Sequence, residues 1–156
     1  MKYSYILVWP HGIKYKDDIL GMISDKYKVV YDKSFKIDQL EKFVLSLYTK
    51  ESKANIKNKN KFLLKNNKNG EIYLYIFDNH LNDIKLYNDI HKSESEWDLK
   101  IQIRNAFNPK LPNVKKRILP LDKGVSHDHV IHSSDTSEDT EHICKLLEID
   151  LGELKD

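Results

Sequence analysis

An almost uninterrupted apolar and aromatic stretch near the N-terminus constrains the fold more than any other feature. Residues 3–9, Tyr-Ser-Tyr-Ile-Leu-Val-Trp, contain one small polar residue, and Pro10 and Gly12 follow directly. A strand with one solvent-exposed face alternates apolar and polar residues, so a continuous apolar run predicts a strand covered on both faces. We therefore expect this strand to lie inside a sheet that other elements cover on each side.

The rest of the chain reads as alternating helices and strands. Helices are predicted at residues 17–26, at 40–47 with Asp38 as the cap, at 81–91, at 96–107 and from Asp135 onward, and strands at 29–35, 71–77 and 129–131. The Lys/Asn-rich segment, residues 49–69, is predicted to be a loop or insertion, and residues 108–123, with three prolines, a second loop.

Bulk properties restrict the class of protein. The length of 156 residues suits a single domain, and the net charge of +2 does not call for a nucleic-acid partner. One cysteine, Cys144, excludes an internal disulfide, and neither a signal peptide nor a membrane span is recognisable. These features predict a cytoplasmic α/β protein.

Histidines are concentrated in one segment. Residues 126–136 hold three of the seven histidines, His127, His129 and His132, among serines and aspartates. Three interpretations remain open: polar residues that complete a turn and cap a helix, a metal site formed by these histidines, or a nucleophilic histidine. For the third, the helix predicted beyond His132 would offer backbone N–H groups to a phosphate, but the spacing alone favours none of the three.

Three short stretches then occur in an order that matches a known family. They are residues 8–12, Val-Trp-Pro-His-Gly, Asn108-Pro109, and residues 131–136, Ile-His-Ser-Ser-Asp-Thr. They resemble Ile-Lys-Pro-Asp-Gly, Thr-Asn-Pro and Ile-His-Gly-Ser-Asp-Ser of the nucleoside diphosphate kinases. The resemblance places His132 on the phosphorylated histidine and implies a ferredoxin-like βαββαβ antiparallel sheet covered by helices, with Mg²⁺ carried in on the nucleotide.

The resemblance also implies roles for other residues. Ser134 and Glu141 would orient His132. The nucleotide and its phosphates would contact Arg104, Lys116, Arg117, His129 and Trp9. Two of these depart from the family pattern, since Trp9 stands in place of a lysine and His129 in place of an asparagine. A tryptophan carries no charge, so transfer should be slower or use another cation.

The sequence thus predicts a phosphotransferase that moves a phosphoryl group from a nucleoside triphosphate to an unidentified acceptor through His132. A homo-oligomer is expected by resemblance. The alternatives are a non-catalytic nucleotide-binding or regulatory module of the same fold, and a metal-binding protein that uses His127, His129 and His132. For Trp9 a simple core role is the competing interpretation, and for Arg104 and Arg117 it is surface ion pairing.

Overall fold

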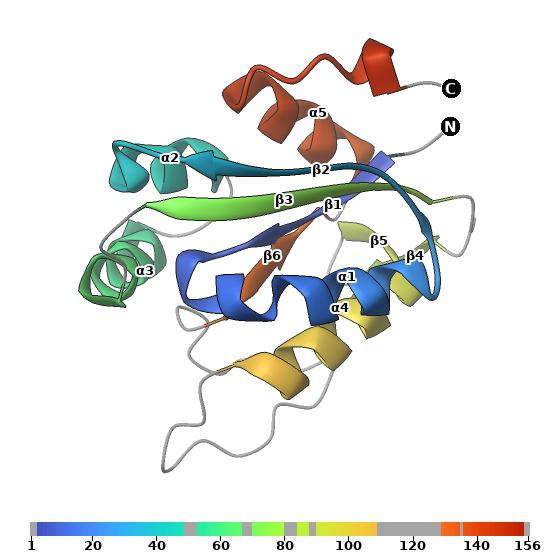
Figure 1. Cartoon of the computed structure of the whole chain (residues 1–156), viewed down its shortest axis with the longest axis horizontal. Coiled ribbons are helices and arrows are strands. Elements are labelled where there is room, and N and C mark those ends of the chain that lie inside the picture. The colour runs from blue at the N-terminus through green and yellow to red at the C-terminus, as the bar shows by residue number, and fades with distance from the viewer. Residues whose placement is uncertain are drawn as a thin grey trace.

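A four-stranded antiparallel sheet forms the centre of the molecule (Figure 1). The computed structural model describes residues 3–48, 53–66, 70–79, 84–87, 90–108, 129–134 and 136–154. The sheet consists of β1 (Tyr3–Val8), β2 (Lys28–Lys36), β3 (Glu71–Asp78) and β6 (Ile131–Ser133) in the order β2-β3-β1-β6. All three neighbouring pairs are antiparallel. This order and the intervening helices confirm the expected ferredoxin-like βαββαβ arrangement.

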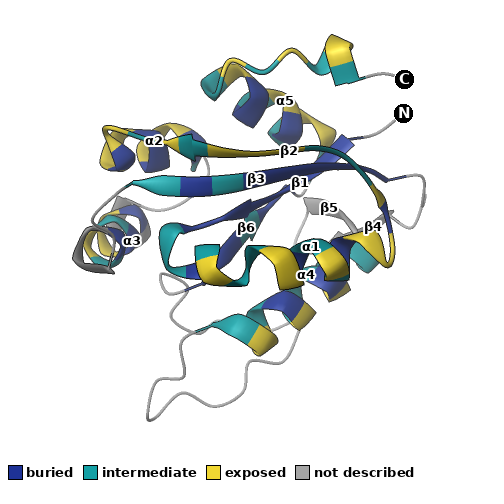
Figure 2. Cartoon of the chain, in the orientation of Figure 1, coloured by how far each residue is buried: buried dark blue, intermediate teal, exposed yellow. Residues whose placement is uncertain are grey.

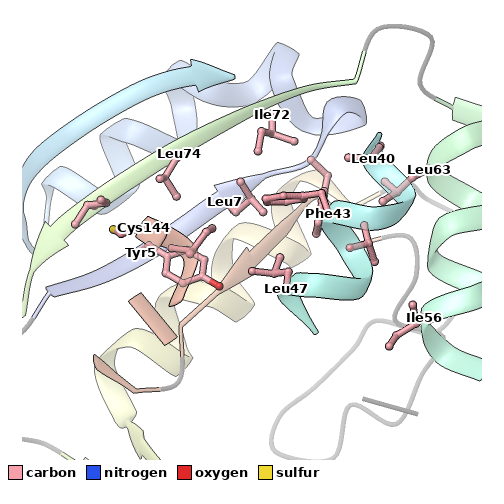
Figure 3. Packing of buried hydrophobic residues seen from close by; sticks show 14 of the residues in the cluster. Tyr5, Leu7, Leu40, Phe43, Leu47, Ile56, Leu63, Ile72, Leu74 and Cys144 are labelled. Atoms are coloured by element: carbon pink, nitrogen blue, oxygen red, sulfur yellow. The ribbon is translucent and has the colours of Figure 1, made fainter. Parts of the chain in front are cut away.

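Helices cover both faces of the sheet (Figure 1). The first face carries α1 (Lys16–Ser24) and α4 (Glu94–Phe107). The second face, called the α2/α3/α5 face below, carries α2 (Leu40–Leu47), α3 (Lys53–Asn66) and α5 (Ser137–Leu146). Successive residues of β1 contribute to the two cores in turn, because side chains of a strand alternate between its faces. Ile6 and Val8 pack toward α1 and α4, and Tyr5 and Leu7 toward the α2/α3/α5 face (Figure 3).

The prediction of a doubly covered first strand is confirmed. Every residue of β1 is buried, which Figure 2 shows as one dark blue strand. The strand leads into a short 3-10 helix, η1 (Pro10–Tyr15), at a close approach of two backbones. A Cβ atom on Gly12 would lie 3.0 Å from both the Cβ and the carbonyl oxygen of Val130. Gly12 therefore lets η1 pack directly against the segment that enters β6.

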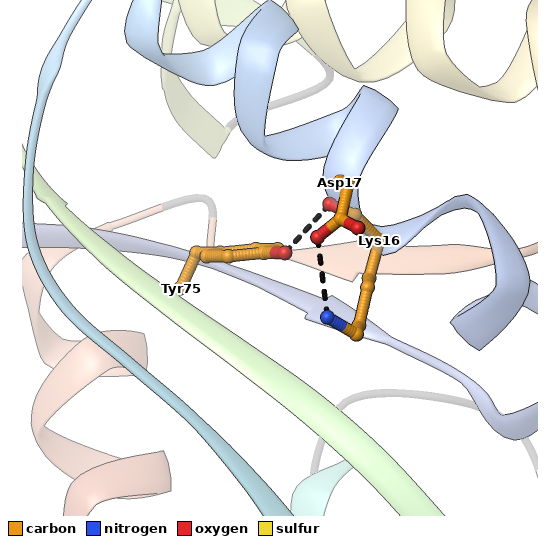
Figure 4. A network of polar contacts seen from close by, with 3 residues as sticks. All are labelled: Lys16, Asp17 and Tyr75. Carbon is orange, nitrogen blue, oxygen red and sulfur yellow. Dashed lines mark hydrogen bonds and ion pairs between the residues drawn. The ribbon is translucent and has the colours of Figure 1, made fainter.

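Polar contacts hold the start of α1 against β3. The Tyr75 hydroxyl donates a hydrogen bond to the Lys16 carbonyl oxygen at 2.6 Å, and the Lys16 ammonium forms an ion pair with Asp17 at 3.1 Å (Figure 4). Burial raises the pKa of Tyr75, so its hydroxyl stays protonated and can serve as a donor. The contact ties the central sheet to the helix that follows η1.

Two predictions of secondary structure are wrong. The expected loop at residues 49–69 contains helix α3, because Ile56 and Leu63 lie on one helical face and are buried in the α2/α3/α5 core, and tertiary packing outweighs a polar composition. The expected helix at residues 81–91 is instead the antiparallel pair β4 (Ile84–Tyr87) and β5 (Ile90–Ser93). Between these strands the sequence reads Asn88-Asp89, a dipeptide that favours turns over helix.

The predicted cap of α2 is also wrong. Gln39, not Asp38, occupies the cap position, and its side chain makes no capping hydrogen bond. The predicted last helix is present as α5, which Thr136 caps through a reciprocal capping box with Asp139. Strand β6 begins two residues later than predicted, at Ile131.

The other predicted elements agree with the structure. They are the helices at 17–26, 40–47 and 96–107 and the strands at 29–35 and 71–77. The loop predicted at 108–123 lies outside the described residues, except for Asn108. Among the helices of the described part of the chain, none is long and apolar enough to cross a membrane.

Candidate functional site

His132 lies in the middle of β6, directly opposite Leu7 of β1. Directly opposed residues of paired strands place their side chains on the same face, and Leu7 belongs to the α2/α3/α5 core. The half-buried imidazole accordingly meets two aromatic rings from that side. Its centre lies 4.6 Å from the ring of Tyr48, which follows α2, and 5.9 Å from the ring of Tyr5.

The environment of His132 disfavours its protonated form. Burial, together with the positive charges of Lys100, Lys59 and Arg104, lowers the pKa of this histidine well below its usual 6.5. A cation near an imidazole raises the free energy of the imidazolium and leaves the neutral form unaffected. At neutral pH the side chain is therefore uncharged and has a nitrogen lone pair, and the positive charges that lower its pKa also favour the approach of an anion.

Arg104 comes from α4 on the opposite face of the sheet. Its Nη2 atom donates a hydrogen bond to the carbonyl oxygen of Ile131 at 3.1 Å, one residue before His132. This bond fixes the guanidinium beside β6. Arg104 thus contacts β6 one residue from His132, and its predicted contact with a phosphate remains a prediction.

Lys59 was not among the predicted site residues. The residue is only 6% exposed, and lysines are seldom buried to this extent. The ammonium nitrogen lies 4.7 Å from the ring centre of Trp9 and 5.6 Å from that of Tyr48. One signal in the sequence could have identified it: Lys59 lies three residues after Ile56 and four before Leu63, on the apolar face of a helix.

Trp9 forms part of the wall behind these residues. Its side chain is fully buried, its ring stacks on Tyr48 at 6.4 Å, and it meets the edge of Phe43 at 6.4 Å. The indole nitrogen makes no hydrogen bond within the described residues. The ring is not exposed for stacking on a base or sugar, so this position contributes packing, and Lys59 covers it.

The two residues predicted to orient His132 are Ser134 and Glu141, and their side chains lie in different environments. The Ser134 hydroxyl accepts a hydrogen bond from the backbone N–H of Tyr5 at 3.0 Å, which extends the pairing of β1 with the chain beyond β6. Glu141 lies on the exposed side of α5. Among the described residues, neither side chain is hydrogen-bonded to the imidazole of His132.

His129 has a separate environment at the end of α4. The side-chain oxygen of Asn108 accepts from the backbone N–H of Val130 at 2.9 Å, which turns the amide nitrogen toward His129 Nδ1, also at 2.9 Å. Because this amide nitrogen can only donate, His129 Nδ1 accepts. The buried ring thus anchors the start of β6, while His132 faces Tyr48.

Three predicted residues, Lys116, Arg117 and His127, lie outside the described part of the chain. The suggested metal site of His127, His129 and His132 therefore remains a prediction. Within the residues that the structure describes, no group of three His, Cys, Asp or Glu side chains could hold a metal ion.

Comparison with solved structures identifies proteins that share the fold of this chain. Nucleoside-diphosphate kinase from Borrelia burgdorferi, solved as a transition-state mimic with bound vanadate and ADP, superposes with a TM-score of 0.58 and 17% identity over 99% of this chain and 90% of that one. The apo enzyme from Encephalitozoon cuniculi gives 0.56 and 16% identity over 100% and 93%. No family model and no curated protein sequence matches. The chain has the fold of these kinases.

Proposed function

We propose that this protein is a nucleoside-diphosphate-kinase-like phosphotransferase that carries the phosphoryl group on His132. One observation carries the proposal: the imidazole of His132 lies on β6 against the ring of Tyr48, and its burial and the positive charges of Lys100, Lys59 and Arg104 keep it neutral. A nucleophilic nitrogen inside a cationic site is what phosphoryl transfer from a nucleotide requires. The shared fold supports the assignment.

The chemistry has two steps. In the first, a ring nitrogen of His132 attacks the γ-phosphorus of the nucleoside triphosphate, a P–N bond forms, and the bridging P–O bond breaks with its electron pair on the departing diphosphate. In the second, an acceptor oxygen attacks the same phosphorus, and the P–N electron pair returns to the imidazole. A neutral imidazole is needed at the outset, which matches the lowered pKa of His132.

The phosphates would be held by cations. Arg104, whose guanidinium lies beside β6, would neutralise charge there. Lys116 and Arg117 are proposed as further phosphate contacts from the segment between α4 and β6. Ser134 and Glu141 keep their proposed roles as orienting groups only if nucleotide binding brings them to the imidazole, and the same condition applies to contacts of the nucleotide with His129 and Trp9. Mg²⁺ would arrive on the nucleotide and neutralise part of its charge.

Partners and location follow the same proposal. The donor is a nucleoside triphosphate, the acceptor is unidentified, and the protein is expected to act in the cytoplasm as a homo-oligomer.

Labelling of the protein tests this function. Wild-type protein and the His132→Gln variant are incubated with γ-labelled ATP and Mg²⁺, and acid-labile, base-stable label on the chain is measured. Label on the wild type alone is the expected result. A folded wild type that binds ATP but acquires no label would exclude the transferase and favour a nucleotide-binding module.

That module is the second candidate, and Trp9 is the observation that favours it. The resemblance places a lysine at this position, whereas the tryptophan here is uncharged and fully buried. A protein of this kind would keep the nucleotide pocket and lack efficient transfer. Binding of ADP and ATP without transfer to His132 would distinguish it from the enzyme.

A further inference from the structure

We propose that Lys59, which extends from α3 across the ring of Trp9, binds the terminal phosphate of the nucleotide whose transfer to His132 is proposed above. This inference rests on that proposed function and adds a residue that the sequence motifs do not contain. It gives a role to the Lys/Asn-rich segment, residues 49–69, for which the sequence predicts a loop or insertion.

Packing determines where the Lys59 ammonium lies. Ile56 and Leu63 anchor the same face of α3 in the core, so the side chain between them is directed inward. The ammonium nitrogen lies over two aromatic rings, 4.7 Å from the centre of the Trp9 ring and 5.6 Å from that of Tyr48. Cation–π attraction to both rings offsets part of the cost of taking an ammonium out of water.

The same tyrosine connects this ammonium to His132. The Tyr48 ring centre lies 4.6 Å from the imidazole centre and 5.6 Å from the Lys59 nitrogen, so both groups border one aromatic ring. The charge of Lys59 also contributes to the lowered pKa of His132. An anionic group that approaches His132 on the Tyr48 side therefore enters the field of this ammonium.

The position of Trp9 explains why a cation from another element is useful here. The resemblance places a lysine at this position, at the end of β1. The indole that replaces it cannot carry charge, and the Lys59 ammonium lies over that indole. A phosphate oxygen binds an ammonium through charge-assisted hydrogen bonds. Lys59 can thus supply such a bond to a terminal phosphate that approaches His132 on the Tyr48 side.

Binding constants for nucleotides of different phosphate number test the assignment. Calorimetry is carried out with AMP, ADP and the non-transferable β,γ-imido analogue of ATP on the wild type, Lys59→Met, Lys59→Arg and Lys57→Met. Lys57 is an exposed lysine of the same helix and serves as the matched control. Labelling from γ-labelled ATP is measured on the same proteins, and thermal unfolding verifies that each is folded.

The expected result is a loss that depends on the terminal phosphate. Lys59→Met should weaken binding of the triphosphate analogue by about tenfold or more, leave AMP nearly unchanged and slow labelling by about a hundredfold. Lys59→Arg should retain most of the triphosphate affinity, and Lys57→Met all of it. If Lys59→Met does not fold, Lys59→Gln takes its place.

Other outcomes separate this inference from the proposed function. An equal loss for all three nucleotides would show that Lys59 only supports the fold, and unchanged affinity and labelling in Lys59→Met would likewise overturn the inference while the transferase stands. A wild type that binds the triphosphate through Lys59 but acquires no label would retain the phosphate contact and reject the transferase. A wild type that binds none of the nucleotides would refute both.

Discussion

The ring of Tyr48 lies 4.6 Å from the imidazole of His132. Tyr48 directly follows α2, and His132 lies in the last strand of the central sheet, so two distant parts of the chain meet at this contact. Tyr48 also stacks on Trp9 and adjoins the ammonium of Lys59. One tyrosine therefore borders the proposed nucleophile, His132, and the ammonium of Lys59.

The pH dependence of labelling should reflect the lowered pKa of His132. An imidazole with the usual pKa of 6.5 is only about one quarter neutral at pH 6. Because burial and the charges of Lys100, Lys59 and Arg104 lower this pKa in the free protein, the second-order rate constant of labelling, measured well below saturating Mg²⁺ and ATP, should be nearly constant from pH 7.5 to pH 6. A rate that halves near pH 6.5 would show an ordinary imidazole.

Stability should depend on pH through the same residue. The folded-state pKa of His132 lies below the unfolded value of about 6.5, so the unfolded chain binds more protons between these two values. The free energy of unfolding should therefore have its full value above pH 6.5. As the pH is lowered below 6.5 it should decrease, by up to about 1.4 kcal/mol per pH unit. Urea unfolding of the wild type and His132→Gln at pH 5 to 8 measures this, and parallel curves for the two proteins would contradict it.

A lysine at position 9 should not be tolerated beside Lys59. Trp9→Lys removes a fully buried indole and places a second ammonium near one that lies 4.7 Å from the Trp9 ring, so the free energy of unfolding should fall by more than about 3 kcal/mol.

Combining Trp9→Lys with Lys59→Met removes the repulsion between the two ammonium groups. The double variant should be more stable than the sum of the single changes predicts, with a coupling energy of about 1 kcal/mol or more. Chemical unfolding of all four proteins completes the cycle, and additive effects would rule out the charge conflict.

The close approach at Gly12 gives a prediction with an internal control. Gly12→Ala should destabilise the protein by about 1 to 3 kcal/mol, because its Cβ would lie 3.0 Å from Val130 and 3.1 Å from Val8. Gly21→Ala should stabilise it by about 0.5 to 1 kcal/mol, since nothing lies within 4 Å and the residue is inside α1. Urea unfolding compares both, and a neutral Gly12→Ala would contradict the tight packing.

Local patterns were sufficient for much of the fold. The apolar run of β1 predicted a doubly covered strand, and helical spacing located α1, α2 and α4. The polar composition of residues 53–66 led to the prediction of a loop where α3 lies. The buried core residues Ile56 and Leu63 stabilise this helix only by packing against the rest of the core, which the local sequence does not show. At the site, the motif around His132 and the motif-based choice of Arg104 could be found in the sequence, whereas Lys59, Lys100 and Tyr48 belong to no motif.

The sequence by itself determined β1, β2 and β3 and the helices α1, α2 and α4, because the spacing of apolar residues and the turn-forming residues act over a few positions. It also determined the candidate nucleophile. Only the tertiary structure decided which charges surround His132, because β6 pairs with β1 beneath α2 and α3, and that packing brings Tyr48 and Lys59 to a histidine far away in the chain. The distances and the burial that lower the pKa of His132 exist only once these elements have packed together.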